Sequence, residues 1–169
     1  MPRDFDGVDD IIDFGSATSL DNIGGEPSVG STRTVATWIN LDTFGEGGFG
    51  RLLNKTATTG WRWHLDNITV SGAFILVVDR AGGTTTDFAR SATNTLVVGR
   101  WFFVCGTYDT SATQRVHLFV GNSGLGTLVE PAYHATDSAG DGSGDDSAQT
   151  LYVGNRAATD RTFDGRMAY

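Results

Sequence analysis

The feature that most limits how this chain can fold is a pair of apolar runs separated by a short polar break. The first run spans residues 101–109 (WFFVCGTYD) and the second spans residues 116–122 (VHLFVGN). Both have the length and the aromatic and β-branched content of strands, and the Asp-Thr-Ser sequence at residues 109–111 favours a turn. The two runs therefore predict an antiparallel hairpin, and a chain that contains such a hairpin is built from sheets.

Short apolar segments of the same kind recur along the rest of the chain, separated by clusters of Gly, Asn or Asp. Helical periodicity is nearly absent, and residues 16–20 are expected to form one helical turn at most. We expect strands at residues 11–14, 33–41, 51–54, 61–66, 74–79, 84–90, 96–98, 101–108, 115–120, 132–134 and 150–153. Many short strands at regular spacing are typical of a β-sandwich or a barrel.

The strand expected at residues 61–66 alternates between apolar and polar positions. Trp61, Trp63 and Leu65 share one face, and Arg62 and His64 share the other. Three apolar side chains on one face predict core packing, although two tryptophans on a shared face are also a candidate sugar platform. Arg62 and His64 are then expected to line an open face or groove, which makes them candidate ligand-binding residues.

The strand expected at residues 101–108 carries apolar residues on both of its faces. We therefore expect this strand to be central and covered on both sides, and we expect Trp38 and Trp101 to lie in the core. Cys105 lies in the same run and is expected to be a buried, unreactive thiol. It is the only cysteine, so the chain cannot form an internal disulfide.

Composition limits the class of partner. The formal net charge is −8 and the isoelectric point is near 4.6. A negative chain disfavours nucleic acid and anionic membranes, because both need a positive surface, and leaves cations, neutral sugars and other proteins. No apolar stretch approaches the roughly 20 residues that span a bilayer, and the first residues show no signal-peptide pattern. The 169 residues fit one domain of ordinary size.

Several segments, read in order, resemble the laminin-G-like, concanavalin A-like superfamily of lectins and glucanases, and within it the bacterial and viral LamG-type modules. The segments are FDGVDD (5–10), TVATWI (34–39), GRWFFVCGTYD (99–109), VHLFV (116–120), LYVGNR (151–156) and FDGRMAY (163–169). The resemblance implies an all-β, two-sheet antiparallel jelly-roll sandwich that occupies residues 1–169 as one domain. Family members continue past the second FDG with a further strand, so we expect this chain to lack part of its last strand. The open C-terminal edge would then suit a homo-oligomer.

The resemblance also implies a calcium ion near one rim of the sandwich, held by Asp or Asn side chains and backbone carbonyls. Asp6, Asp9 and Asp10 lie in the first of these segments, and Asp164 lies in the last. If the termini are neighbours, as the resemblance implies, these carboxylates converge, and a divalent cation would relieve their repulsion. The alternative is that they cap turns and accept backbone hydrogen bonds. The acidic, glycine-rich stretch at residues 137–146 is a second calcium candidate, and it also fits a solvated surface loop.

Glucanases of this superfamily use two Glu side chains on one strand, because two carboxylates must flank the scissile bond. Glu26, Glu46 and Glu130 are far apart in the sequence, and none lies in an acidic pair on an expected strand. We therefore expect a non-catalytic module that recognises carbohydrate or protein, with calcium as a candidate aid, no nucleic-acid partner and no membrane insertion. By resemblance the module belongs outside the cell, on a cell surface or on a virion. Two alternatives stay open: a glycoside hydrolase or lyase of the same fold, and a structural assembly domain of a larger surface protein.

Overall fold

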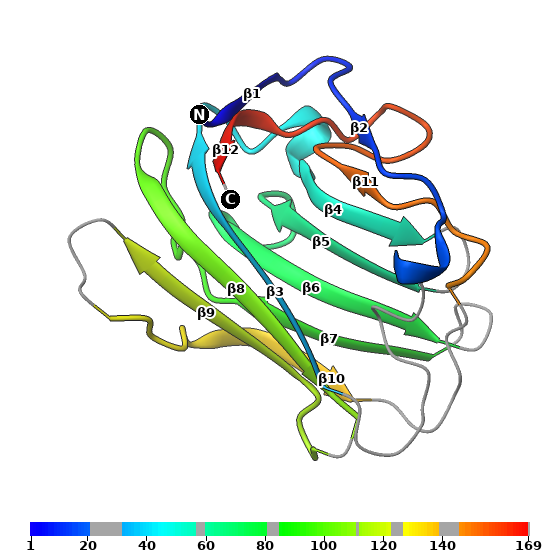
Figure 1. Ribbon diagram of the computed structural model, residues 1–169. Helices are drawn as coiled ribbons and strands as arrows, with labels where there is room; N and C mark the ends of the chain where they lie inside the picture. The colour runs from blue at the N-terminus through cyan, green and yellow to red at the C-terminus, as the bar shows by residue number, and fades with distance from the viewer. Residues whose placement is uncertain are drawn as a thin grey trace.

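The chain folds into two antiparallel sheets stacked face to face (Figure 1). The computed structural model describes residues 1–20, 32–56, 60–80, 85–110, 112–122, 127–138 and 146–168. The five-stranded sheet has the order β1 (Arg3–Asp6), β12 (Asp164–Ala168), β3 (Thr32–Leu41), β8 (Trp101–Asp109) and β9 (Val116–Asn122). The seven-stranded sheet has the order β10 (Tyr133–Ser138), β7 (Thr85–Ser91), β6 (Ala73–Arg80), β5 (Gly60–Asp66), β4 (Arg51–Thr56), β11 (Tyr152–Val153) and β2 (Ile12–Asp13). The all-β, two-sheet prediction is therefore confirmed.

In the described residues, helical structure is limited to two single turns, η1 (Thr18–Leu20) and η2 (Glu46–Gly48). The first agrees with the single turn expected at residues 16–20. Within the ranges that the structure describes, neither turn is long and apolar enough to cross a membrane.

The hairpin predicted from the two apolar runs is present. Strands β8 and β9 pair from Phe102 opposite Asn122 to Tyr108 opposite Val116. On its other side β8 pairs with β3 along nine consecutive residues. The longest apolar run of the sequence therefore lies inside its sheet, where every inward side chain has neighbours on both sides.

The core fills the space between the two sheets. Trp63 and Phe74 from the seven-stranded sheet and Ile39 and Val104 from the five-stranded sheet have no exposed surface. Each side chain of this kind contributes about 1.5–3 kcal/mol when it leaves water. The alternation expected along β5 is confirmed, because Trp61, Trp63 and Leu65 all belong to this core.

The strand expected at residues 96–98 is wrong, and strands β1 and β12 lie outside all of the expected strand ranges. Residues 96–98 form an irregular connection with a bend and a turn, in which the Leu96 amide donates to the Gly72 carbonyl at 2.8 Å and the Leu96 side chain is buried. Strands β1 and β12 are polar and short, so their periodicity is weak. Each sends one large apolar side chain inward, Phe5 and Met167.

The outer face of the five-stranded sheet corrects a second expectation. Trp38 is 37% exposed and Trp101 is half-buried, so neither lies in the core. Trp38 instead packs edge to face on Phe103, with ring centroids 5.4 Å apart. Strand β8 has a partner strand on each side, but at these positions it is covered on its inner face alone, because a two-layer sandwich buries only one face of each sheet. Cys105, on the same outer face, is nevertheless buried, and burial raises its pKa.

The last strand has a partner on each side. Strand β12 pairs with β1 from Asp6–Asp164 to Arg3–Met167, and with β3 from Leu41–Gly165 to Trp38–Ala168. The chain termini are therefore neighbours, as the resemblance implies (Figure 1). Among the described strands, residues 32–37 of β3 extend beyond this pairing and pair with β8 alone. Self-association through this edge stays a prediction.

Candidate functional site

A cavity of about 300 Å³ lies on the outer face of the seven-stranded sheet, on the side away from the core. Five arginines contribute to its lining: Arg51, Arg62, Arg90, Arg156 and Arg161. They come from three strands and from the loop after β11. Nearly half of the 11 arginines in an acidic chain are therefore gathered around one cavity.

Strand register explains how the arginines of the sheet come together. Arg51 of β4 lies opposite His64 of β5, His64 lies opposite Ile75 of β6, and Ile75 lies opposite Arg90 of β7. Residues in register point to the same side of a sheet, and neighbouring strands are about 4.8 Å apart. One transverse row therefore carries a cation, an imidazole, an apolar side chain and a second cation across the outer face.

A β-bulge sets the direction of Arg51. The register of β4 against β5 shifts between Arg51 and Leu53. Leu52 is fully buried in the core, while Arg51 lines the cavity. A bulge places two residues of one strand opposite one of its partner and turns side chains that strict alternation would place differently.

Arg51 is the most unusual side chain of the site. It is 7% exposed, and its Nε and Nη1 atoms are buried without a hydrogen-bond partner. Burial, followed by repulsion from Arg62, Arg156 and Arg161, lowers the pKa of Arg51 to about 9. The group is still charged at neutral pH, so the fold holds a buried cation with two nitrogen atoms, Nε and Nη1, that have no acceptor in the protein.

The other arginines have partners. Arg62 pairs with Asp79, and Nε of Arg90 lies 2.9 Å from Oδ2 of Asp66. Arg156 donates through Nε and Nη2 to the two carboxylate oxygens of Asp160, at 2.6 and 2.7 Å. Arg161 donates to the Asp160 carbonyl at 3.1 Å. Five guanidinium groups around three carboxylates leave an excess of positive charge at the cavity.

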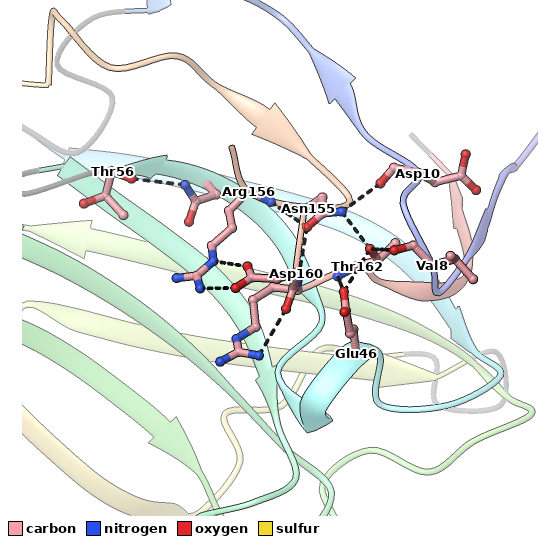
Figure 2. Close-up of polar contacts among 10 residues, drawn as sticks. Val8, Asp10, Glu46, Thr56, Asn155, Arg156, Asp160 and Thr162 are labelled. Carbon is pink, nitrogen blue, oxygen red and sulfur yellow. Dashed lines mark hydrogen bonds and ion pairs between the residues drawn. The ribbon is translucent and has the colours of Figure 1, made fainter. Parts of the chain in front are cut away.

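A buried asparagine holds the loop that carries Arg156 and Arg161 (Figure 2). Asn155 has no exposed surface, and its Oδ1 accepts from the Arg156 amide at 2.9 Å and the Arg161 amide at 3.1 Å. Its Nδ2 donates to Oγ1 of Thr162 at 2.7 Å, and that hydroxyl donates to the Val8 carbonyl at 2.9 Å. The loop is therefore fixed to the N-terminal segment, which orients both guanidinium groups.

His64 lies among these cations as a neutral ring. Its Nδ1 lies 2.8 Å from the Leu65 carbonyl, an acceptor, so Nδ1 carries the proton. Burial first, and then the charge of Arg51, lower the pKa of His64 well below its ordinary value. Neutral His64 protonated at Nδ1 offers a lone pair at Nε2, so the cavity contains an acceptor as well as donors.

Apolar groups complete the lining. Ile75 and Val77 of β6 contribute aliphatic surface between the charged strands. Phe49 packs edge to face on His64, with ring centroids 6.1 Å apart, and Arg161 lies over its ring at 5.5 Å. The cavity therefore combines cations, a neutral acceptor and apolar surface, which together suit an anion carried on an organic ring.

The two residues expected to bind ligand, Arg62 and His64, both lie in the lining of this cavity. Sequence reasoning missed the other four arginines of the lining, Arg51, Arg90, Arg156 and Arg161. The Arg156–Asp160 spacing hints at a local ion pair, but the position of Arg51 depends on a bulge and on strand register. Alternation of apolar and polar residues predicts which side chains of one strand share a face, but it does not predict which residues of other strands lie beside them.

The four carboxylates proposed for calcium are separate from this cavity. Asp6 Oδ1 accepts from the Val8 amide and Asp10 Oδ2 accepts from the Asp6 amide, each at 2.9 Å. Asp6 and Asp164 are paired across β1 and β12, while Asp9 is exposed. Within the described part of the chain, no group of three or more such side chains is arranged to hold a metal ion. Calcium binding stays a prediction.

The acidic stretch that formed the second calcium candidate divides into three parts. Asp137 and Ser138 belong to strand β10, and residues 139–145 lie outside the described residues. Asp146 is fully buried, with Oδ1 3.0 Å from Nζ of the equally buried Lys55. Asp146 therefore does not belong to a solvated loop, because it neutralises the only lysine of the chain.

Known proteins give no independent identification of this site. Comparison of the chain with protein-family models and with curated proteins finds no match.

Proposed function

We propose that the protein is a recognition module that binds an anionic carbohydrate in the arginine-lined cavity. The observation that carries the proposal is the buried guanidinium of Arg51, whose Nε and Nη1 atoms have no partner. A buried charge without a partner costs several kcal/mol. The anionic group of a ligand would supply the missing acceptor, which explains why the cation lies at a cavity.

The size and mixed lining of the cavity favour a sugar over a small inorganic ion. A volume of about 300 Å³ is at the lower end of the range for small-molecule sites. Ile75 and Val77 offer aliphatic surface for the C–H face of a ring, and His64 offers an acceptor for a hydroxyl. An inorganic anion would use the arginines and leave these groups without a role.

The remaining parts of the proposal rest on the resemblance to LamG-type modules. We propose a jelly-roll arrangement of the concanavalin A-like type, a non-catalytic role, and a location on a cell surface or virion. Calcium at Asp6, Asp9, Asp10 and Asp164 would assist by fixing the joined termini. A thermal midpoint that does not rise in millimolar calcium would remove the metal from this proposal, because a ligand of the native state stabilises it by mass action.

The test is a glycan array that contains neutral and acidic glycans, probed with the wild-type protein and two variants. Arg51→Gln removes the buried cation. Arg166→Gln is the matched control, because Arg166 is an exposed arginine on β12 of the other sheet. We expect the wild type and Arg166→Gln to retain acidic glycans and no neutral ones, and Arg51→Gln to retain neither. Retention of neutral glycans, or unchanged retention by Arg51→Gln, would contradict the proposal.

A further inference from the structure

The row of side chains across strands β4 to β6 presents three different chemistries in a fixed order. Arg51 has two unpartnered donor atoms, His64 offers a neutral acceptor, and Ile75, which lines the cavity but is only 4% exposed, offers a small apolar surface. At about 4.8 Å per strand the three positions span about 10 Å. One six-membered sugar ring with its substituents covers this length, so a single sugar residue can meet all three positions at once.

The unmatched group at the first position favours a flat anion. A guanidinium is planar, and its donors pair best with the two coplanar oxygens of a carboxylate. Arg51 is only 7% exposed and its unpartnered Nε and Nη1 atoms are themselves buried, so the guanidinium must turn toward the cavity when it binds the anion. A carboxylate attached directly to a ring carbon brings the ring with it, over Ile75. A sulfate or phosphate ester is tetrahedral and holds its ring one ester oxygen farther away.

The charge of the cavity favours a ligand with one negative charge per ring. Asp66, Asp79 and Asp160 already pair with three of the five arginines. His64 is held neutral, since burial and the nearby arginines oppose its protonation. The excess of positive charge is therefore small, and a densely sulfated or phosphorylated ring would bring its further charges toward these carboxylates.

We infer that the ligand of the cavity is a uronic acid residue, whose ring carboxylate binds Arg51, whose neighbouring hydroxyl donates to Nε2 of His64, and whose C–H face lies on Ile75. This inference rests on the proposed function and narrows it from anionic carbohydrates to carboxylate-bearing ones.

Three sugars that share one ring separate the contribution of negative charge from that of a planar carboxylate. In D-glucuronate carbon 6 is itself the carboxylate carbon, D-glucose 6-sulfate carries a tetrahedral anion on the oxygen attached to carbon 6, and D-glucose has no charge. Ligand-observed NMR of the wild-type protein measures millimolar dissociation constants for all three. We expect saturable binding of D-glucuronate, at least tenfold weaker binding of D-glucose 6-sulfate, and no binding of D-glucose.

Two variants test the assignment of Arg51. Arg51→Lys keeps the positive charge but loses the planar donors, so we expect it to weaken D-glucuronate binding at least tenfold. Arg166→Gln, on the other sheet, should bind as the wild type does. Near-UV circular dichroism confirms that each variant is folded, and the comparison of sugars on the wild type does not depend on either variant.

The outcomes distinguish the inference from the function on which it rests. Equal or tighter binding of D-glucose 6-sulfate would overturn the uronate assignment and leave anion recognition in place. Equal binding by Arg51→Lys and the wild type would overturn the role of the planar guanidinium. Failure of both charged sugars to bind the wild type would overturn the inference and the proposed function together.

Discussion

Arg51 shows how a binding site can reduce the stability of the protein that carries it. Its guanidinium is charged at neutral pH, although burial lowers its pKa to about 9. Its unmatched donors have lost their water without gaining a protein acceptor. Such a group costs on the order of a few kcal/mol. An apolar side chain of similar length would fill the same space without this cost.

We therefore predict that Arg51→Met raises the free energy of unfolding by about 1–2 kcal/mol while it abolishes binding of acidic sugars. Urea denaturation measures the first effect. Arg62→Met is the matched control, because Arg62 is paired and its loss leaves Asp79 without a cation. That variant should lose stability. A destabilised Arg51→Met protein that still binds acidic sugars would contradict this account of the residue.

Protonation of His64 makes the free energy of unfolding depend on pH in the range just below pH 6.5. Its pKa in the folded protein is well below 6.5, because burial and Arg51 disfavour the charged ring. The unfolded chain therefore binds this proton more readily, and stability is lost as the pH falls below about 6.5. We predict a decline of up to about 1.4 kcal/mol per pH unit between pH 6.5 and 5. Asp160, whose pKa is lowered to about 2 by Arg156, contributes to acid instability only at lower pH.

The comparison of His64→Gln with His134→Gln checks this prediction by urea denaturation across that range. His134 is an exposed residue of β10, so its replacement should leave the decline unchanged. His64→Gln should flatten it. Equal slopes for the wild type and His64→Gln would show that another group is responsible.

At the residue scale, the sequence indicates which side chains of a strand share a face of the sheet. It does not indicate which residues of other strands and loops join them at the cavity. Alternation along a single strand is enough to bring Arg62 and His64 to the open side of the sheet. Arg51 reaches the same cavity only because β4 bulges opposite β5. Arg156 and Arg161 reach it because the buried amide of Asn155 turns their loop over the sheet. The first device depends on how two strands pair and the second on side-chain hydrogen bonds within a loop, and alternation along one strand reveals neither.

Between the strands, one glycine fixes how the loop of the site joins the N-terminal segment. Gly154 follows β11 directly and precedes Asn155. Its φ angle is +82°, and a Cβ at this position would overlap the ring of buried Phe5 on β1. Phe5 in turn packs edge to face on Phe163, with centroids 5.9 Å apart. Close contact between the loop and β1 therefore requires a residue without a side chain.

We predict that Gly154→Ala destabilises the protein by about 2–4 kcal/mol, because overpacking adds to an unfavourable φ angle. It should also weaken binding of acidic sugars, since Asn155 is the next residue. Gly15→Ala is the matched control: its φ angle is +71°, and nothing lies within 4 Å of its Cβ position. That variant should lose only about 1 kcal/mol. Equal losses in urea denaturation would exclude the contact with Phe5 as the cause.

Elements with strong periodicity are predictable from the sequence, and elements that depend on tertiary contacts are not. The hairpin of β8 and β9 and the alternating strand β5 follow from local pattern alone. Strand β1 (RDFD) has one buried residue, so its pairing with β12 decides its structure. Residues 96–98 are apolar enough for a strand but form an irregular connection, from which Leu96 reaches the core. At residues 96–98 the local pattern gives no indication that the chain leaves the sheet.

For the whole molecule, net charge describes the chain and not its sites. A net charge of −8 argues against anionic partners if the charge is taken to be spread evenly over the surface. The fold nevertheless gathers five arginines on one face of one sheet. Screening reduces the repulsion from distant acidic residues beyond about 8 Å at physiological salt, while the contacts inside the cavity persist. The expectation of neutral sugars therefore gives way to a proposal of acidic ones.

The most direct measurement is a ¹H–¹⁵N correlation spectrum of the arginine Nε–H groups during a titration with D-glucuronate. The Nε–H of Arg51 is buried and unpaired, and its resonance is identified by its absence in Arg51→Lys. We predict that this resonance shifts saturably with D-glucuronate and stays in place with D-glucose. A resonance that stays in place with D-glucuronate, or a linear drift shared by all arginines, would contradict binding at this cavity.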